Sequence, residues 1–294
     1  MHVTRRLLLV HAHPDDECIG TGGSMAKYAS EGAEVTLVTC TLGEEGEILL
    51  PEVSHLASDQ EDKLGALRQQ ELAASMAALG VTDWRLLGGP GRFRDSGMVG
   101  TPPNDNPACF WRADLLEAAL ELVKVIREVR PQVVVTYDDF GGYGHPDHLQ
   151  AHRVTHYAVA LAGIDGFHPE MGEPWQISKL YWTAMSRSEV RAGILALREA
   201  GHTDGFAEMD PDDLPFATDD ELITTDIDAS AFLEQKFDAL RAHATQISTE
   251  GGFLALVDTA GVSMFGHEYF RLVLGQSGPL VQGRERDLFA GVNA

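Results

Sequence analysis

Two short segments of the sequence carry side chains that can bind a metal ion and move protons. The first, residues 11–17, reads His-Ala-His-Pro-Asp-Asp-Glu, and the second, residues 137–148, ends in His-Pro-Asp-His. In the first segment, His13 and Asp16 lie on a turn that the intervening proline helps to fix, so an imidazole and a carboxylate can converge on one cation. His148 from the second segment can complete a site of two histidines and one carboxylate. Three protein ligands leave a position open for water, as a catalytic zinc site requires.

The same two segments supply residues for acid–base chemistry. Asp15 is the candidate to take a proton from the attacking water, because a metal lowers the pKa of water to roughly 7 and a carboxylate is then a sufficient base. His145 can donate a proton to a leaving amine, or stabilise a developing oxyanion while charged. Asp147 can orient His145, or act as a helix N-cap. Tyr143, between two glycines, can reach the carbonyl oxygen of a substrate or simply pack.

Both segments directly follow predicted β-strands. Apolar and β-branched runs predict strands at Leu7–His11, Glu34–Cys40, Trp84–Leu87, Gln132–Tyr137 and Lys179–Ala184. Helical patterns predict helices at Gly23–Ser30, Gln60–Leu79, Arg112–Val129 and Asp147–Ala162. Capping boxes are predicted at Ser58 with Glu61 and at Ser186 with Glu189. This alternation predicts an α/β fold with a Rossmann-like, mostly parallel sheet and helices on both faces. Ligands bind beyond the carboxyl ends of such strands, which is where both segments lie.

The C-terminal third is predicted to form a smaller, mixed α/β part. We expect a Rossmann-like metal-hydrolase core over residues 1–200 and an extension over residues 201–294 that packs on it, together one continuous domain. The extension is predicted to contain strands at Leu222–Thr225, Phe253–Val257 and Tyr269–Leu274 and a helix at Ala229–Thr245. Residues 43–58 and 88–110 are long segments rich in Gly, Pro and charge, and loops of this length are usually functional or mobile.

The composition excludes several classes of partner. Of the 294 residues, 44% are apolar, so a large core can be buried. The net charge of −23 argues against a nucleic-acid partner, because binding to phosphate backbones depends on clustered Lys and Arg. No apolar stretch approaches the ~20 residues of a membrane span, and the first apolar run is too short for a signal peptide. We therefore expect a cytoplasmic protein with a small-molecule substrate and no membrane partner, compatible with a homo-oligomer.

Other features of the sequence indicate structure rather than chemistry. The three cysteines are odd in number and form no C-x-x-C pair, which argues against disulfides and a Cys-based zinc site. Gly20–Gly23 follows the first predicted strand, but the third glycine of a dinucleotide fingerprint would fall at Met25. His148, His152 and His156 recur every four residues, as the histidines of an H-E-x-x-H metalloprotease motif do. Position 149 is Leu, however, so the Glu that this motif requires is absent. We expect His152 and His156 to pack or to support the site.

Several motifs together resemble a known enzyme family. The sequence His-Pro-Asp-Asp-Glu at residues 13–17 and His-Pro-Asp-His at residues 145–148 resembles the zinc-dependent N-acetylglucosaminyl de-N-acetylases. Thr-Cys-Thr-Leu-Gly-Glu-Glu-Gly-Glu at residues 39–47, Gly-Arg-Phe-Arg-Asp-Ser-Gly-Met at residues 91–98 and Gly-Gly-Tyr-Gly-His at residues 141–145 are similar to the mycothiol-biosynthesis branch. Within it, the chain resembles members that deacetylate N-acetylglucosaminyl-inositol. The resemblance runs along most of the first 160 residues and more thinly beyond them.

The resemblance implies one zinc ion per chain and hydrolysis of an acetamide to a free amine and acetate. The implied zinc ligands are His13, Asp16 and His148. The implied catalytic groups are Asp15 as general base, His145 as acid or electrostatic partner and Tyr143 at the oxyanion. The positions that match substrate-binding residues of the branch are Glu47, Arg68, Asp95 and Met98. Carboxylates and a guanidinium make directional bonds to hydroxyls, although such residues also occur as plain surface charge on long loops.

Four alternatives remain open on the sequence. A mycothiol S-conjugate amidase would use the same metal site with a roomier acyl pocket, although the segment Gly43–Glu47 favours the deacetylase. A deacetylase of another N-acetyl amino sugar is the second. A non-catalytic sugar-binding protein is the third, and the intact metal set and Asp15 argue against it. Finally, two histidines and one carboxylate also describe non-haem Fe²⁺ sites, but hydrolysis needs no redox change, so Zn²⁺ is the default.

Overall fold

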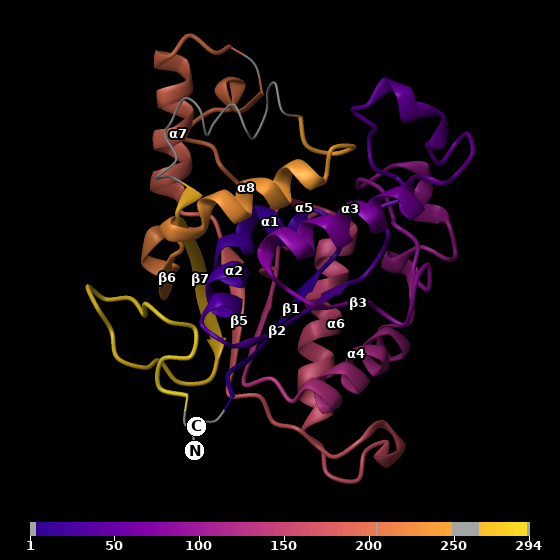
Figure 1. Ribbon diagram of the computed structural model, residues 1–294, viewed down its shortest axis with the longest axis vertical. Coiled ribbons are helices and arrows are strands. Elements are labelled where there is room, and N and C mark those ends of the chain that lie inside the picture. Colours follow the sequence, from indigo (N-terminus) through magenta and orange to yellow (C-terminus); the bar gives the residue numbers. More distant parts are fainter. Residues whose placement is uncertain (1–3, 204, 249–264, 293–294) are drawn as a thin grey trace.

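A computed structural model describes residues 4–203, 205–248 and 265–292 of the chain. Within these residues, seven strands form one sheet in the order β3-β2-β1-β4-β5-β7-β6 (Figure 1). The strands are β1 (Arg6–His11), β2 (Glu34–Thr39), β3 (Asp83–Leu86), β4 (Val133–Thr136), β5 (Lys179–Ala184), β6 (Thr225–Asp228) and β7 (His267–Leu274). β1 to β5 pair in parallel, whereas β7 runs antiparallel to both β5 and β6. The predicted α/β class with a mostly parallel sheet is therefore confirmed.

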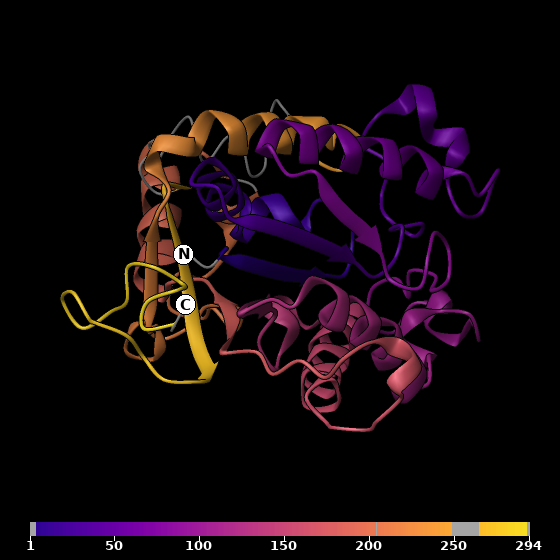
Figure 2. The same cartoon turned by 60° about the horizontal axis from the view of Figure 1, so that its bottom comes forward.

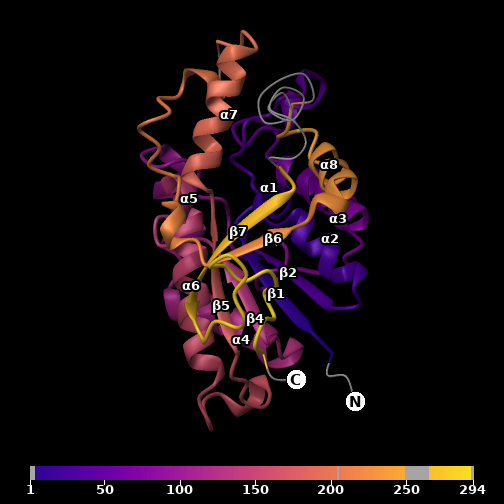
Figure 3. The same cartoon turned by 90° about the vertical axis from the view of Figure 1, so that its left-hand side faces the viewer.

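Helices cover both faces of this sheet. They are α1 (Asp16–Gly20), α2 (Gly22–Ser30), α3 (Leu64–Leu79), α4 (Leu115–Val129), α5 (Gly141–Gly144), α6 (Pro146–Ala162), α7 (Arg187–Glu199) and α8 (Leu233–Ala242). Figures 2 and 3 show α3 and α8 on one side of the sheet, and α4 and α6 on the other. Successive residues of β1 enter opposite cores, because Leu7 and Leu9 pack with the first layer and Leu8 and Val10 with the second. A strand buried on both faces explains its unbroken apolar sequence.

The predicted boundaries of β1 to β5, α2 and α6 agree with the structure to within one residue, whereas α3, α4 and α8 begin three or four residues later than predicted. Ser186 caps α7 by accepting a hydrogen bond from the backbone N–H of Glu189, as the second capping box predicts. The first capping box is wrong, because α3 begins only at Leu64. Ser58 instead donates to Glu45 Oε2 at 2.7 Å. The hydroxyl of Ser58 therefore bonds to Glu45 of the preceding loop instead of capping a helix.

The C-terminal residues extend the same sheet. β7 occupies the predicted segment, β6 begins at Thr225, where the predicted strand ended, and the predicted strand Phe253–Val257 lies outside the described residues. Because β6 and β7 complete the sheet that β1 to β5 begin, we propose that both parts form one continuous domain. In the part of the chain that the structure describes, no helix has the length and apolarity to cross a membrane.

Candidate active site

The two histidine segments meet beyond the carboxyl ends of the central strands β1 and β4. These strands are neighbours in the sheet, and the strand order reverses between them. The chain leaves β1 toward α1 and α2, and leaves β4 toward α5 and α6, which belong to opposite layers. Such a divergence opens a crevice at the sheet edge, which is the usual ligand site of this architecture.

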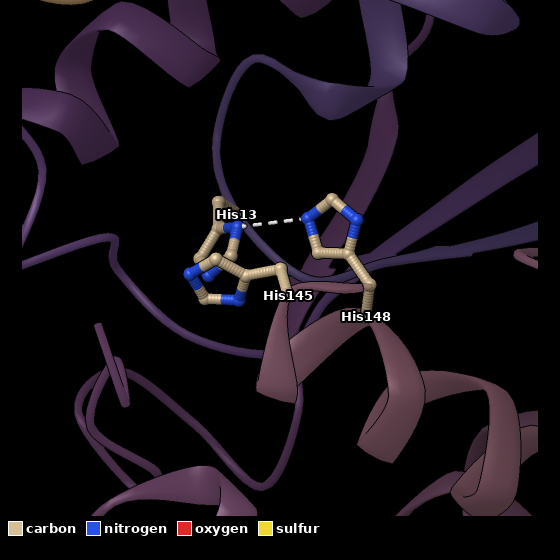
Figure 4. Close-up of side chains that lie close together, drawn as sticks. All are labelled: His13, His145 and His148. Carbon is tan, nitrogen blue, oxygen red and sulfur yellow. Dashed lines mark hydrogen bonds between the residues drawn. The ribbon is translucent and has the colours of Figure 1, made fainter. Parts of the chain in front are cut away.

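Three ligand atoms converge in this crevice. His13 Nδ1 lies 3.3 Å from His148 Nε2 (Figure 4). Asp16 Oδ2 lies 3.3 Å from His13 Nδ1 and 3.4 Å from His148 Nε2. Ligand atoms that bind one tetrahedral Zn²⁺ at roughly 2.0–2.2 Å are separated by about 3.3–3.5 Å. The donor types and their spacing therefore fit one divalent ion.

Hydrogen bonds on the far sides of both imidazoles leave these nitrogens free to bind. His148 Nδ1 lies 3.1 Å from the carbonyl oxygen of Gly141, which can only accept, so Nδ1 carries the proton and Nε2 keeps its lone pair. His13 Nε2 lies 3.2 Å from the Asp147 carboxylate, so Nε2 keeps its proton and Nδ1 is the nitrogen that a metal would bind. A carboxylate or carbonyl behind a histidine commonly orients it as a metal ligand.

Tyr137, which lies at the end of the predicted strand Gln132–Tyr137 and was not among the predicted site residues, supports the third ligand. Its hydroxyl donates to Asp16 Oδ2 at 2.7 Å and accepts from the backbone N–H of Ala12 at 2.7 Å. Its ring also stacks on His148, with centroids 4.2 Å apart and planes at 19°. One buried side chain therefore contacts two of the three candidate ligands.

The electrostatics of the site favour a cation. Burial alone would lower the pKa of His13, but Asp95, Asp147 and Asp16 raise it well above its ordinary value. Burial also opposes ionisation of Asp16, yet His148 and His13 hold the pKa of this carboxyl well below its usual range. The negative potential that favours a proton on His13 also favours a divalent ion. Binding of the ion would release this proton.

Other sets of described side chains also bring ligand atoms within 4.8 Å of one another. They are His13 with His145 and His148, His13 with Asp95 and Asp147, and Glu17 with Cys18 and His243. The first two share His13 and so belong to the same crevice. Asp95 and Asp147 approach Nε2 of His13, the nitrogen turned away from Asp16 and His148. In the third set, Glu17 and His243 are bonded directly to each other.

Asp15 lies beside this triad in a strained backbone conformation. Its φ of 115° falls in a region that favours glycine. The guanidinium of Arg68 donates to Asp15 Oδ2 at 3.0 Å and to the carbonyl oxygen of Pro14. Burial raises the pKa of Asp15 to about 6, against the opposing effect of Arg68. The carboxyl therefore ionises near the pH at which a general base is useful.

His145 and Asp147 interact differently from the prediction. The carboxylate of Asp147 does not orient His145, because it accepts from the backbone N–H and the hydroxyl of Ser96 and contacts His13. His145 is itself the N-cap of α6, since its Nδ1 accepts from the backbone N–H of Asp147. Burial, with His13 and His148 nearby, lowers the pKa of His145 to about 3. Because Nδ1 accepts a hydrogen bond, the proton of the neutral ring lies on Nε2.

Tyr143 lies on a glycine-rich turn at the mouth of the site. Its neighbours Gly142 and Gly144 have φ angles of 70° and 89°, which require glycine as the sequence predicts. Its side chain is half exposed, and its ring centroid lies 5.0 Å from that of His148. The residue thus borders the candidate metal ligands while facing solvent.

The predicted substrate-binding residues fall into two groups. Glu47 and Met98 are exposed on the long loops. Arg68 and Asp95 are only 3% and 4% exposed, and they are bound to protein groups. Arg68 contacts Asp15 and Gly43, and Asp95 accepts from the backbone N–H of Gly97 at 2.8 Å. Asp95 also accepts from the backbone N–H of Glu45 at 3.1 Å. These two residues therefore do not form part of an open rim, and the sequence could not reveal this because Asp15 and Glu45 are about 50 positions from Arg68 and Asp95.

Solved structures share this fold. N,N'-diacetylchitobiose deacetylase from Pyrococcus horikoshii has a TM-score of 0.62 and 21% identity over 92% of this chain and 84% of that chain. GalB, the 4-carboxy-2-hydroxymuconate hydratase from Pseudomonas putida, has a TM-score of 0.60 and 18% identity over 95% and 100%. Because proteins named for different reactions match, the likeness shows the fold alone.

Curated relatives match along almost the whole chain. A protein from Catenulispora acidiphila named 1D-myo-inositol 2-acetamido-2-deoxy-alpha-D-glucopyranoside deacetylase 1 is 58% identical over 98% of this chain and 90% of its own length. A deacetylase of the same substrate name from a Nocardioides species is 58% identical over 99% and 100%. The sequence pattern described as PIG-L: GlcNAc-PI de-N-acetylase matches residues 8–159, which include His13, Asp16 and His148. The chain therefore belongs to the PIG-L, GlcNAc-PI de-N-acetylase, family.

Proposed function

We propose that this protein is a metal-dependent deacetylase that hydrolyses the acetamide of N-acetylglucosaminyl-inositol, giving glucosaminyl-inositol and acetate in mycothiol biosynthesis. The observation that carries the proposal is the convergence of His13 Nδ1, Asp16 Oδ2 and His148 Nε2 within 3.4 Å, directly beside Asp15. The substrate is supported by relatives that bear this substrate in their names and match along nearly all of the chain.

The three ligand atoms would hold one divalent ion, with Asp95 and Asp147 behind His13. When bound, such an ion polarises a carbonyl oxygen and lowers the pKa of water. Hydrolysis changes no oxidation state, so we propose Zn²⁺, and Fe²⁺ is the alternative that metal analysis would reveal. The remaining steps, proton transfer and stabilisation of the oxyanion, are assigned to Asp15, His145 and Tyr143.

Asp15 acts as the general base that takes a proton from the attacking water. Arg68 fixes its carboxylate, and a pKa near 6 leaves it ionised at neutral pH yet basic enough to accept a proton. The same carboxyl, once protonated, passes the proton to the leaving amine. His145, whose Nε2 carries a proton, is the alternative donor to the amine.

His145 and Tyr143 stabilise the oxyanion that forms when water attacks the carbonyl. The neutral His145 ring carries its proton on Nε2, since its Nδ1 accepts from the backbone of Asp147. This N–H and the hydroxyl of Tyr143 offer two donors at the mouth of the site. Removal of one oxyanion donor typically lowers turnover by roughly 10²–10³-fold.

A product assay tests the proposed reaction. Metal-loaded protein is incubated with N-acetylglucosaminyl-inositol, N-acetylglucosamine, N,N'-diacetylchitobiose and a mycothiol S-conjugate, and free amine and acetate are measured. We expect the highest kcat/KM for N-acetylglucosaminyl-inositol. A preference for the conjugate would make the protein an amidase, and a preference for another sugar would reassign the substrate.

Three variants test the assigned residues. His13→Ala and His148→Ala should lose both the metal and activity, whereas the wild type should carry about one ion per chain. Asp15→Asn should keep the metal but lose roughly 10²–10⁴-fold in kcat, the usual contribution of a general base. Full metal occupancy in both histidine variants would remove the metal site from the proposal.

A further inference from the structure

A buried network connects Asp15 to the C-terminal part of the chain. Glu17 and His243 are both 0% exposed, and His243 Nε2 lies 2.7 Å from Glu17 Oε1. Ser75 of α3 donates to the same oxygen at 2.7 Å. The other oxygen of Glu17, Oε2, accepts the backbone N–H of Asp15 at 2.8 Å. Glu17 therefore joins α3 and the segment after α8 to the peptide group of Asp15.

This peptide group needs such support. Asp15 has φ 115° and ψ −32°, and non-glycine residues in unfavourable regions keep such angles only when the surroundings over-determine them. The carbonyl oxygen of Asp15 accepts from the backbone N–H of Cys18 at 3.1 Å. Arg68 holds the preceding carbonyl, at Pro14. Of these anchors, the Glu17 carboxylate is the one that binds the N–H of Asp15 itself.

The position of Glu17 depends in turn on His243. Burial alone would lower the pKa of His243, but Glu17 raises it, which favours a charged pair. Among the described residues, His243 Nδ1 has no hydrogen-bond partner, so the bond to Glu17 is the one its ring makes. A buried carboxylate that loses its cationic partner must find another arrangement or remain unpaired.

We propose that His243 is a positioning residue for the deacetylase reaction. It holds the carboxylate of Glu17 so that Oε2 fixes the strained peptide group of Asp15 and aims the Asp15 side chain at the attacking water. This role rests on the proposed function of Asp15 as general base. His243 lies outside residues 8–159, the part of the chain that matches the family pattern, so the proposal gives the C-terminal part a share in catalysis.

The test compares His243→Ala, His243→Gln and a matched control in the same segment. The glutamine side chain retains an N–H donor for Glu17, whereas alanine removes it. The control is Thr245→Val, because Thr245 also docks this segment on α3, through a 2.7 Å bond from its hydroxyl to Glu71, but does not touch Glu17. Asp15→Asn is included to test the base itself.

We expect His243→Ala to lower kcat by roughly 10²-fold, the cost of a displacement of about 1 Å in a reacting group. KM for N-acetylglucosaminyl-inositol and the metal content should stay near wild type, and His243→Gln should recover most of the rate. In metal-free protein, amide hydrogen exchange of the peptide containing Asp15 should accelerate in His243→Ala. Thr245→Val should change neither kcat nor this exchange.

The outcomes separate the two proposals. Loss of kcat in Asp15→Asn with unchanged kcat in His243→Ala would overturn the role of His243 and leave the deacetylase proposal intact. Unchanged kcat in Asp15→Asn would instead remove the base on which both rest. Equal losses in Thr245→Val and His243→Ala would show that docking of the segment matters rather than Glu17. If His243→Ala fails to fold, His243→Leu removes the same donor while filling more of its space, and unchanged kcat and exchange in that variant would overturn the proposal.

Discussion

At the scale of single residues, the geometry of the candidate metal site depends on groups that would not touch the ion. The carbonyl of Gly141 and the carboxylate of Asp147 select which nitrogen of each histidine keeps its lone pair. Tyr137 orients the carboxylate of Asp16, because its hydroxyl donates a hydrogen bond to Oδ2. Ligand direction is therefore set before any ion binds, which reduces the conformational cost of binding.

Tyr137→Phe tests this support. The substitution removes the hydroxyl that donates to Asp16 but keeps the ring that stacks on His148. We expect metal affinity to fall by roughly 10–100-fold, the usual effect of losing such a partner, with a parallel loss of activity at limiting metal. Competition with a chromogenic chelator measures the affinity. Tyr143→Phe is the control and should lower kcat while leaving the affinity unchanged.

The pH dependence of the reaction follows from Asp15. Burial raises the pKa of this carboxyl to about 6, above the ordinary carboxyl value, and a general base works only when ionised. The rate should therefore fall as the pH decreases, with a midpoint at or below about 6, because a bound cation lowers the same pKa further.

Arg68→Met should move this acidic limb to higher pH, since Arg68 opposes the rise in pKa. Arg94→Met is the control, because that guanidinium pairs with Glu45 and Asp62 instead. The measurement is kcat/KM against pH on metal-loaded protein. An acidic limb that stays in place in Arg68→Met would mean that another group sets it.

The ligand triad could be predicted from the sequence because its members lie in two short motifs that each follow a strand. Their supports could not, because they are distant in the chain. Tyr137 and Asp16 are separated by 121 positions, and His243 and Glu17 by 226. The pairing of β1 with β4 brings Tyr137 to Asp16, and the position of the chain after α8 brings His243 to Glu17. A lone His after a helix gives no local signal of such a partner.

At the scale of elements, the packing of α3 and the neighbouring loops decides which predicted substrate-binding residues are buried and which are exposed. The sequence predicted a helix through Arg68, but not which way its side chain points. α3 packs on α8 and turns Arg68 inward, so its guanidinium is bonded to Asp15 and Gly43 rather than open to a substrate hydroxyl. The start of α3 differs for a similar reason, since Ser58 bonds to the loop rather than to the helix.

Glu47 is therefore the carboxylate that we expect to read the inositol. It is exposed on the loop between β2 and α3, whereas Asp95 is buried behind His13. Glu47→Gln should lower kcat/KM for N-acetylglucosaminyl-inositol roughly ten- to a hundredfold more than for N-acetylglucosamine, the range for a lost charged hydrogen bond. Asp95→Asn is the control and should affect both substrates alike. An unchanged ratio in Glu47→Gln would exclude a role for this residue in recognising inositol.

At the scale of the whole molecule, a buried ion pair attaches the C-terminal residues to the sheet. Lys179 of β5 and Glu285 are 2% and 0% exposed, and Lys179 Nζ lies 2.5 Å from Glu285 Oε1. Tyr181 donates to the second oxygen of Glu285, which also accepts from Thr225 of β6. Glu285 therefore bonds the C-terminal residues to both β5 and β6.

Lys179→Met should destabilise the fold by about 3–5 kcal/mol, because it leaves the carboxylate of Glu285 buried without its cation. Urea unfolding followed by circular dichroism measures the change. Lys124→Met removes an exposed partner of Glu121 and should cost at most about 1 kcal/mol. Adding Glu285→Gln to Lys179→Met should restore part of the loss. Equal effects of the two lysine variants would mean that the buried pair does not stabilise the tail.

The strained backbone at Asp15 sets a limit on how this protein can be stabilised. A glycine at this position would adopt φ 115° without strain, so selection for thermostability alone would favour losing the one carboxylate proposed to act as base. Heat-challenge screening of this enzyme would therefore enrich well-folded but inactive variants unless turnover is selected at the same time. The strain at Asp15 marks a position where resistance to heat and catalytic competence are opposed.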